Sequence, residues 1–200
     1  MGSVDDAVAA IHSGGVVILP TDTVYGLCAT PYREQPARLL YRLKGRPEGM
    51  PTALLCKDVE LLFECVPELR GRTADRVRAL LPAPLTLILP NPARRFPWLN
   101  GPRPDAIGVR VPAVQGAARD VLEQVGAVTA TSANLHGGPD PNRLADVPHE
   151  IRRGCVAEID GGELPGISST VLDLTGPEPR VVRDGAVPAA EALERLGRVD

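Results

Sequence analysis

Residues 16–27 read Val16-Val17-Ile18-Leu19-Pro20-Thr21-Asp22-Thr23-Val24-Tyr25-Gly26-Leu27, and the choice of fold class starts from them. The opening apolar run is continuous, which is typical of a strand buried on both faces. Open α/β sheets bind ligands at the carboxyl ends of their strands, so the hydroxyl groups that follow this run are expected where a ligand would lie. A second interpretation stays open at this point, in which Thr21 and Asp22 form a turn and cap the backbone that follows.

Helical and strand-like segments alternate along the rest of the chain. Helices are expected at 4–12, 38–43, 72–81, 113–125 and 189–196. Strands are expected at 16–19, 52–56, 85–89, 107–111, 128–130, 156–159, 170–174 and 180–182. This alternation predicts an α/β protein with a mixed sheet. The Pro- and Gly-rich stretches 82–104 and 137–148 are interpreted as loops, so residues 1–200 are expected to form one domain with its core at about 4–188.

The composition narrows the functional classes. A net charge of −3 and an aromatic content of 3% argue against a protein that clamps nucleic acid over its whole surface. The cysteines and histidines lack metal-site spacing, so structural thiols and no metal site are expected. The apolar runs are far shorter than the roughly 18 residues of a membrane span, and no signal peptide is visible. A cytoplasmic location without membrane association is therefore expected.

Three further polar motifs lie beside apolar segments. Leu43-Lys44-Gly45-Arg46-Pro47 closes a helix and could grip phosphate, although the helix dipole also favours cations there. Thr129-Ala130-Thr131-Ser132-Ala133-Asn134 leaves a strand with small groups able to hydrogen-bond a polar ligand. Ile167-Ser168-Ser169-Thr170-Val171-Leu172-Asp173 is followed by Arg183-Asp184-Gly185. Taken singly, each motif could be ordinary loop chemistry.

Taken together, the motifs resemble the YrdC family. The matching stretches are the Pro20–Leu27 motif, Lys44-Gly45-Arg46-Pro47, Pro84-Leu85-Thr86, Val109-Arg110-Val111-Pro112, Ser132-Ala133-Asn134, Ser169-Thr170-Val171 and Arg183-Asp184-Gly185. They occur in the family's order from about residue 15 to residue 185. The resemblance implies a twisted mixed β-sheet flanked by helices, with a central concave ligand pocket.

The resemblance also implies an activity. Synthases of this family join L-threonine, bicarbonate and ATP into threonylcarbamoyl-AMP and release pyrophosphate. A partner transferase then moves the threonylcarbamoyl group to the tRNA adenosine next to the anticodon. The implied catalytic residues are Lys44 and Arg46, and the implied threonine-binding residues are Thr23, Arg110, Ser132 and Ser169. The implied ATP-binding residues are Arg46, Met50, Asn134, Asn142 and Arg183. Mg²⁺ is expected to be held mainly through the nucleotide.

The chain departs from the family pattern at Met50, Thr52, Leu55 and Asp184. Two other functions therefore stay open, a diverged relative that performs another adenylation or carbamoyl transfer, and an RNA-binding or ribosome-assembly module. Weak RNA binding is also kept as an expectation beside the synthase activity. The synthase is favoured because its substrates supply the nucleophile and the leaving group, so the protein needs only to position them and neutralise charge.

Overall fold

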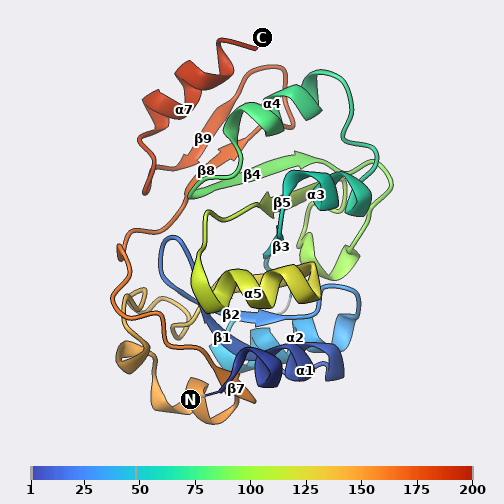
Figure 1. The fold of residues 1–200 in the computed structure, drawn as a ribbon. Coiled ribbons are helices and arrows are strands. Elements are labelled where there is room, and N and C mark those ends of the chain that lie inside the picture. Colours follow the sequence, from blue (N-terminus) through green and yellow to red (C-terminus); the bar gives the residue numbers. More distant parts are fainter. Residues whose placement is uncertain (1, 48, 200) are drawn as a thin grey trace.

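The computed structural model describes residues 2–47 and 49–199, in which nine strands form one twisted mixed sheet (Figure 1). The strand order is β7-β1-β2-β6-β3-β5-β4-β8-β9. The strands are β1 (Val17–Pro20), β2 (Tyr25–Ala29), β3 (Ala53–Cys56), β4 (Leu85–Pro90), β5 (Ala106–Arg110), β6 (Ala127–Ser132), β7 (Ala157–Glu158), β8 (Thr170–Asp173) and β9 (Arg180–Arg183). The pairs β7–β1, β3–β5 and β4–β8 are parallel, and the other neighbours are antiparallel. The expectation of an α/β protein with a mixed sheet is confirmed.

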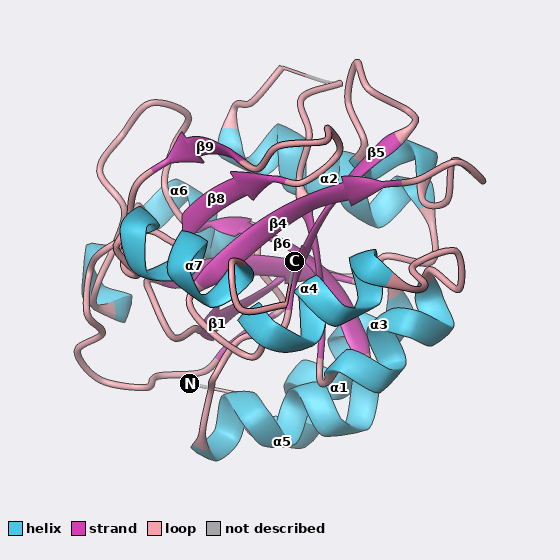
Figure 2. Cartoon of the chain, turned by 90° about the horizontal axis from the view of Figure 1, so that it is seen from above, coloured by secondary structure: helices cyan, strands magenta, loops and turns pink. Residues whose placement is uncertain are grey.

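Helices cover both faces of this sheet. They are α1 (Val4–Ser13), α2 (Glu34–Lys44), α3 (Val59–Cys65), α4 (Arg72–Leu80), α5 (Gly116–Val125), α6 (His149–Arg153) and α7 (Ala189–Leu196), with short 3₁₀ turns η1 (Pro97–Leu99) and η2 (Leu144–Asp146). α1 lies beside α5 and α4 lies near α7 (Figures 1 and 2), and in Figure 1 the α4–α7 pair is at the top of the molecule and the α1–α5 pair in its lower half. None of the helices in residues 2–47 and 49–199 is both long and apolar enough to span a membrane.

The opening apolar run is buried from both sides. Val17 and Leu19 pack in a cluster with residues of α1 and α5, whereas Val16 and Ile18 pack with residues of α2 and α6 on the opposite face. Successive side chains of a strand point to opposite faces, so a strand between two helical layers needs apolar residues at every position. A third cluster holds β3, β4, β5 and β8 against α3, α4 and α7.

Several expected boundaries were wrong. β2 was not expected, yet it begins at Tyr25 and pairs antiparallel with β1, so the polar turn is confined to residues 21–24. α3 and α6 were also missed. α2 begins at Glu34 rather than residue 38 because Pro36 is tolerated in the first helical turn. α5 begins at Gly116 rather than residue 113, and β7 has only two residues.

The last helix is anchored through an arginine. Arg195 of α7 donates from Nη2 to the Ala79 carbonyl at 2.8 Å and to the Leu80 carbonyl at 3.1 Å. These carbonyls lie at the C-terminal end of α4, where backbone acceptors are unpaired and a positive charge is favoured. α7 is therefore held to α4 by charge, and apolar packing joins it to the cluster over the sheet.

Candidate active site

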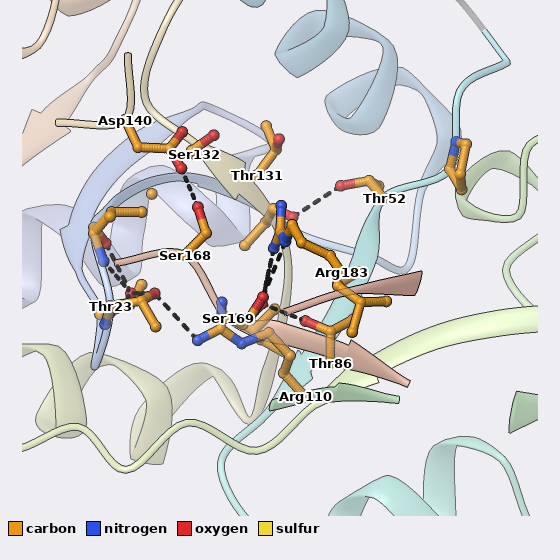
Figure 3. Close-up of a pocket in the computed structure, with 18 of the residues that line it drawn as sticks. Thr23, Thr52, Thr86, Arg110, Thr131, Ser132, Asp140, Ser168, Ser169 and Arg183 are labelled. Carbon is orange, nitrogen blue, oxygen red and sulfur yellow. Dashed lines mark hydrogen bonds between the residues drawn. The ribbon is translucent and has the colours of Figure 1, made fainter. Parts of the chain in front are cut away.

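A polar pocket lies where the turn after β1, the end of β6 and the ends of β5 and β9 converge (Figure 3). Its cavity volume is about 180 Å³. This is smaller than the ~300–1,000 Å³ of sites for drug-sized ligands, so a ligand of nucleotide size must extend beyond the cavity. Three arginines line the pocket, namely Arg46, Arg110 and Arg183. Its hydroxyl groups come from Thr21, Thr23, Thr52, Thr86, Thr131, Ser132, Ser168 and Ser169.

The turn at residues 21–24 is built by one hydroxyl. Thr21 Oγ1 accepts from the backbone N–H groups of Thr23 and Val24, both at 3.2 Å, and donates to the Val24 carbonyl at 2.7 Å. The turn interpretation is therefore right for Thr21. Asp22 instead accepts from Arg110 and from the backbone N–H of Ala113, and Thr23 lines the pocket. The same short segment is thus both a turn and part of the pocket wall.

Arg110 forms a buried ion pair with Asp22. Its Nη2 lies 2.6 Å from Asp22 Oδ1 and 3.3 Å from Thr23 Oγ1, and the two side chains expose only 11% and 6% of their surface. Burial lowers the pKa of Arg110, and the neighbouring Asp22 charge opposes that shift. Arg110 Nε is buried without a hydrogen-bond partner among the described residues. A buried polar group without a hydrogen-bond partner destabilises the folded state, and such groups are typical of functional positions.

Arg183 and Ser169 form a second polar group with Thr86. Arg183 donates to the Ser169 carbonyl from Nε at 3.0 Å and from Nη2 at 2.8 Å. The Ser169 and Thr86 hydroxyl oxygens are 2.8 Å apart. These contacts fix one cation and two hydroxyl groups on the wall that also holds Arg110 (Figure 3).

The third cation, Arg46, follows the end of α2. Gly45 ends the helix in the left-handed conformation at φ 62°, and the backbone N–H of Arg46 donates to the Tyr41 carbonyl at 2.9 Å. Arg46 then lines the pocket, with Nη2 2.9 Å from the Pro51 carbonyl and Nη1 3.4 Å from Thr131 Oγ1. Its Nε is also buried without a partner among the described residues.

Lys44 lies behind the pocket wall. Its side chain is buried, and Nζ donates to the Ser132 carbonyl at 2.7 Å, to the Asn134 carbonyl at 3.0 Å and to the Asn134 side-chain oxygen. Burial lowers the pKa of Lys44 to about 8, with the Asp140 charge acting against the shift and the Arg46 charge adding to it. Lys44 therefore ties the end of α2 to the end of β6 and places Ser132.

This shifted pKa makes a testable prediction about stability. The unfolded chain keeps the lysine proton up to about pH 10.4, whereas the folded chain loses it near pH 8. Between these values the unfolded state binds more protons, so the free energy of unfolding should rise with pH. A Lys44→Met variant lacks this titration, and the titrating groups that do not interact with Lys44 cancel in the comparison. The thermal midpoint of the unmodified protein minus that of the variant should increase from about pH 7.5 to about pH 9.5. A difference in thermal midpoint that does not depend on pH would contradict the lowered pKa of Lys44.

The structure brings together six of the residues singled out in the sequence. These pocket-lining residues are Thr23, Arg46, Arg110, Ser132, Ser169 and Arg183. Lys44 and Asn134 contact Ser132 from behind, while Met50 and Asn142 are not among the lining residues. Sequence reasoning missed the pocket positions of Thr52, Thr86, Asp140 and Ser168. Thr86 and Ser168 belong to the sequence motifs described above, whereas Asp140 carries no signal beyond the prolines on either side.

The departures from the family pattern are accommodated locally. Thr52 Oγ1 donates to the Ala130 carbonyl at 2.8 Å, and Leu55 contributes an apolar patch to the pocket. Asp184 Oδ1 accepts from the backbone N–H of Ala189 at 2.9 Å, at the start of α7. This oxygen is thereby occupied in holding α7, although the next residue towards the N-terminus, Arg183, faces the pocket.

Fold and pocket together define an α/β protein with a cavity on which three arginines converge, an arrangement suited to a small ligand with negative charge. No three His, Cys, Asp or Glu side chains gather for a metal ion in the part of the chain that the structure describes. A family model described as "Telomere recombination", Sua5_yciO_yrdC, matches residues 9–185. The chain belongs to this Sua5/YciO/YrdC family.

Curated relatives of the chain are named threonylcarbamoyl-AMP synthase. One from Pyrococcus abyssi is 31% identical over 194 residues, and the match covers 96% of this chain but only 57% of the relative. One from Halorhodospira halophila is 34% identical and covers 90% of this chain and 88% of the relative. The structure of P. abyssi Sua5 complexed with L-threonine matches 97% of this chain and 57% of that one, with a TM-score of 0.88 and 32% identity. The chain thus spans little more than half of the P. abyssi protein and most of the H. halophila protein.

Proposed function

We propose that the protein is a threonylcarbamoyl-AMP synthase that uses L-threonine, bicarbonate and ATP. The observation that carries this proposal is the convergence of Arg46, Arg110 and Arg183 with hydroxyl groups in one cavity. The names of its relatives, and the L-threonine complex of P. abyssi Sua5, support the same activity. The reaction forms an N–C bond between threonine and the carbonate carbon and an O–P bond to the α-phosphorus, and it releases water and pyrophosphate.

The pocket residues have distinct roles in this proposal. Arg110, held by Asp22, binds the threonine carboxylate, and Thr23, Ser132 and Ser169 offer hydroxyl groups to the rest of the amino acid. Arg46 and Arg183 bind carbonate and phosphate oxygens. Their positive charges offset the repulsion between these anionic groups. Because the substrates carry the reacting groups, the protein contributes by positioning and charge neutralisation.

The nucleotide is the least enclosed substrate in this arrangement. We propose that it extends from the cavity past Asn134 and Asn142 and near Met50, with Mg²⁺ held mainly by its phosphates and by water. We further propose that residues 1–200 act as a single domain, that the protein works in the cytoplasm, and that a transferase passes the product to tRNA. Weak direct contact with RNA belongs to the same proposal.

The proposal is tested by incubating the protein with ATP, Mg²⁺, bicarbonate and L-threonine. Pyrophosphate release should require both threonine and bicarbonate, and mass spectrometry should identify threonylcarbamoyl-AMP. Omitting each substrate in turn is the control. Nucleotide binding without this product would indicate a diverged relative with another acyl donor. Salt-sensitive RNA binding without any turnover would instead support an RNA-binding module.

A further inference from the structure

One acidic side chain lines the pocket in the described part of the chain, and it has no ion-pair partner there. Asp140 belongs to the loop after β6, and its Oδ2 accepts a hydrogen bond from the Ser168 hydroxyl. Its other oxygen, Oδ1, accepts none from the described residues. No described Arg or Lys lies within ion-pair distance of it, although three arginines line the same cavity. A carboxylate left free among cations is available to a positive charge on the ligand.

The backbone keeps Asp140 away from those arginines. Prolines 139 and 141 flank it, and each fixes its own φ angle. The Pro141 carbonyl accepts from the backbone N–H of Tyr25 at 2.9 Å, which fastens the loop to the start of β2. One residue further, the Asn142 carbonyl accepts from the backbone N–H of Leu164 at 2.8 Å. The carboxylate is therefore presented by a stiff segment and has little freedom to swing across the cavity.

Asp140 and Arg110 lie apart from each other in the pocket. Figure 3 shows Asp140 with Ser132 and Ser168 on one side of the pocket, and Arg110 with Thr86 on the other. A ligand that carries an anion and a cation a few bonds apart fits such a separation. An α-amino acid is a ligand of this kind, with its carboxylate and its ammonium on one carbon atom.

We infer that Asp140 binds the ammonium group of the amino-acid substrate and so selects an α-amino acid. This inference rests on the proposed function and adds a specificity residue to it. Ser168 orients the carboxylate through its hydrogen bond to Oδ2, so Oδ1 is the oxygen that would accept from the ligand.

The test compares two ligands that differ only in the cationic group. L-Threonine and the 2,3-dihydroxybutanoate of the same stereochemistry share a carboxylate and a side-chain hydroxyl, but the second has a hydroxyl in place of the ammonium. Binding of each is measured by calorimetry with the unmodified protein and with Asp140→Asn, which keeps an acceptor for Ser168. The dissociation constant for threonine should rise about 10-fold or more in the variant, while that for the hydroxy acid changes less than about twofold. The control is Asp146→Asn, an exposed carboxylate in η2 that should alter neither constant.

The other outcomes have separate meanings. Equal losses for both ligands, or no loss for either, would overturn the assignment of Asp140 as the ammonium site. Weaker binding of Mg·ATP with unchanged threonine binding would overturn it in favour of a magnesium ligand. If the unmodified protein bound neither threonine nor the hydroxy acid, the proposed function itself would fail, and this inference with it.

Discussion

Replacing Arg46 by alanine should lower threonine-dependent pyrophosphate release by about 100-fold or more, the usual cost of losing a donor to developing charge. The thermal midpoint should hardly change. Within the fold the guanidinium makes one hydrogen bond of good length, to the Pro51 carbonyl, and a weaker one to Thr131. Losing them costs about 1 kcal/mol. Initial rates and a thermal melt of the same preparation measure both effects.

Arg42→Ala is the matched control for this substitution. Arg42 lies in the last turn of the same helix, is exposed, and has no side-chain hydrogen bond to the described residues. Its removal should leave both rate and midpoint unchanged. If Arg46→Ala lowered the midpoint strongly, or if the two variants lost activity equally, Arg46 would have a structural role instead of a role in the pocket.

The Asp22→Asn variant should lose about 3 kcal/mol or more of the free energy of unfolding, because it leaves the buried Arg110 charge without a counter-charge. Activity should fall as well, since the same contact aims Arg110 at the pocket. Urea denaturation at neutral pH measures the stability change. The exposed pair Arg143–Glu163, whose side chains expose 58% and 59% of their surface, provides the comparison. Glu163→Gln should cost less than about 1 kcal/mol.

A second substitution separates stability from function at this pair. Adding Arg110→Met to Asp22→Asn removes the orphaned charge and should restore most of the lost stability, although the double variant should remain inactive. A double variant as unstable as the single one would show that Asp22 acts through its contact with the backbone N–H of Ala113 and not through Arg110.

The fold was predictable where one physical signal dominates. The apolar run at 16–19 predicted β1 because a strand covered on both faces excludes polar side chains. β2 escaped prediction because it begins inside a motif rich in turn residues, and its pairing with β1 depends on a turn built by the Thr21 hydroxyl. α3 and α6 are short helices of seven and five residues, too short for a clear helical period.

The sequence singled out several residues that line the pocket, but it did not indicate how their side chains pair. Resemblance to a family pointed to the three arginines of the pocket, but no pattern in the sequence indicates that Lys44 is buried behind Ser132 or that Asp22 is the partner of Arg110. These pairings join residues 88 positions apart and follow from the strand order. The sequence does not single out Asp140, because it does not show that this carboxylate lines the pocket without an ion-pair partner among the described residues.

The junction of β9 with α7 connects the C-terminal helix to the pocket. Arg183 faces the ligand site, and the adjacent Asp184 secures the first turn of α7, which Arg195 in turn fastens to α4. By thermodynamic linkage, a ligand that draws Arg183 into place also favours the docked state of α7, and loosening of α7 weakens binding by the same free energy. We therefore expect substitutions that loosen α7 to weaken ligand binding in the pocket.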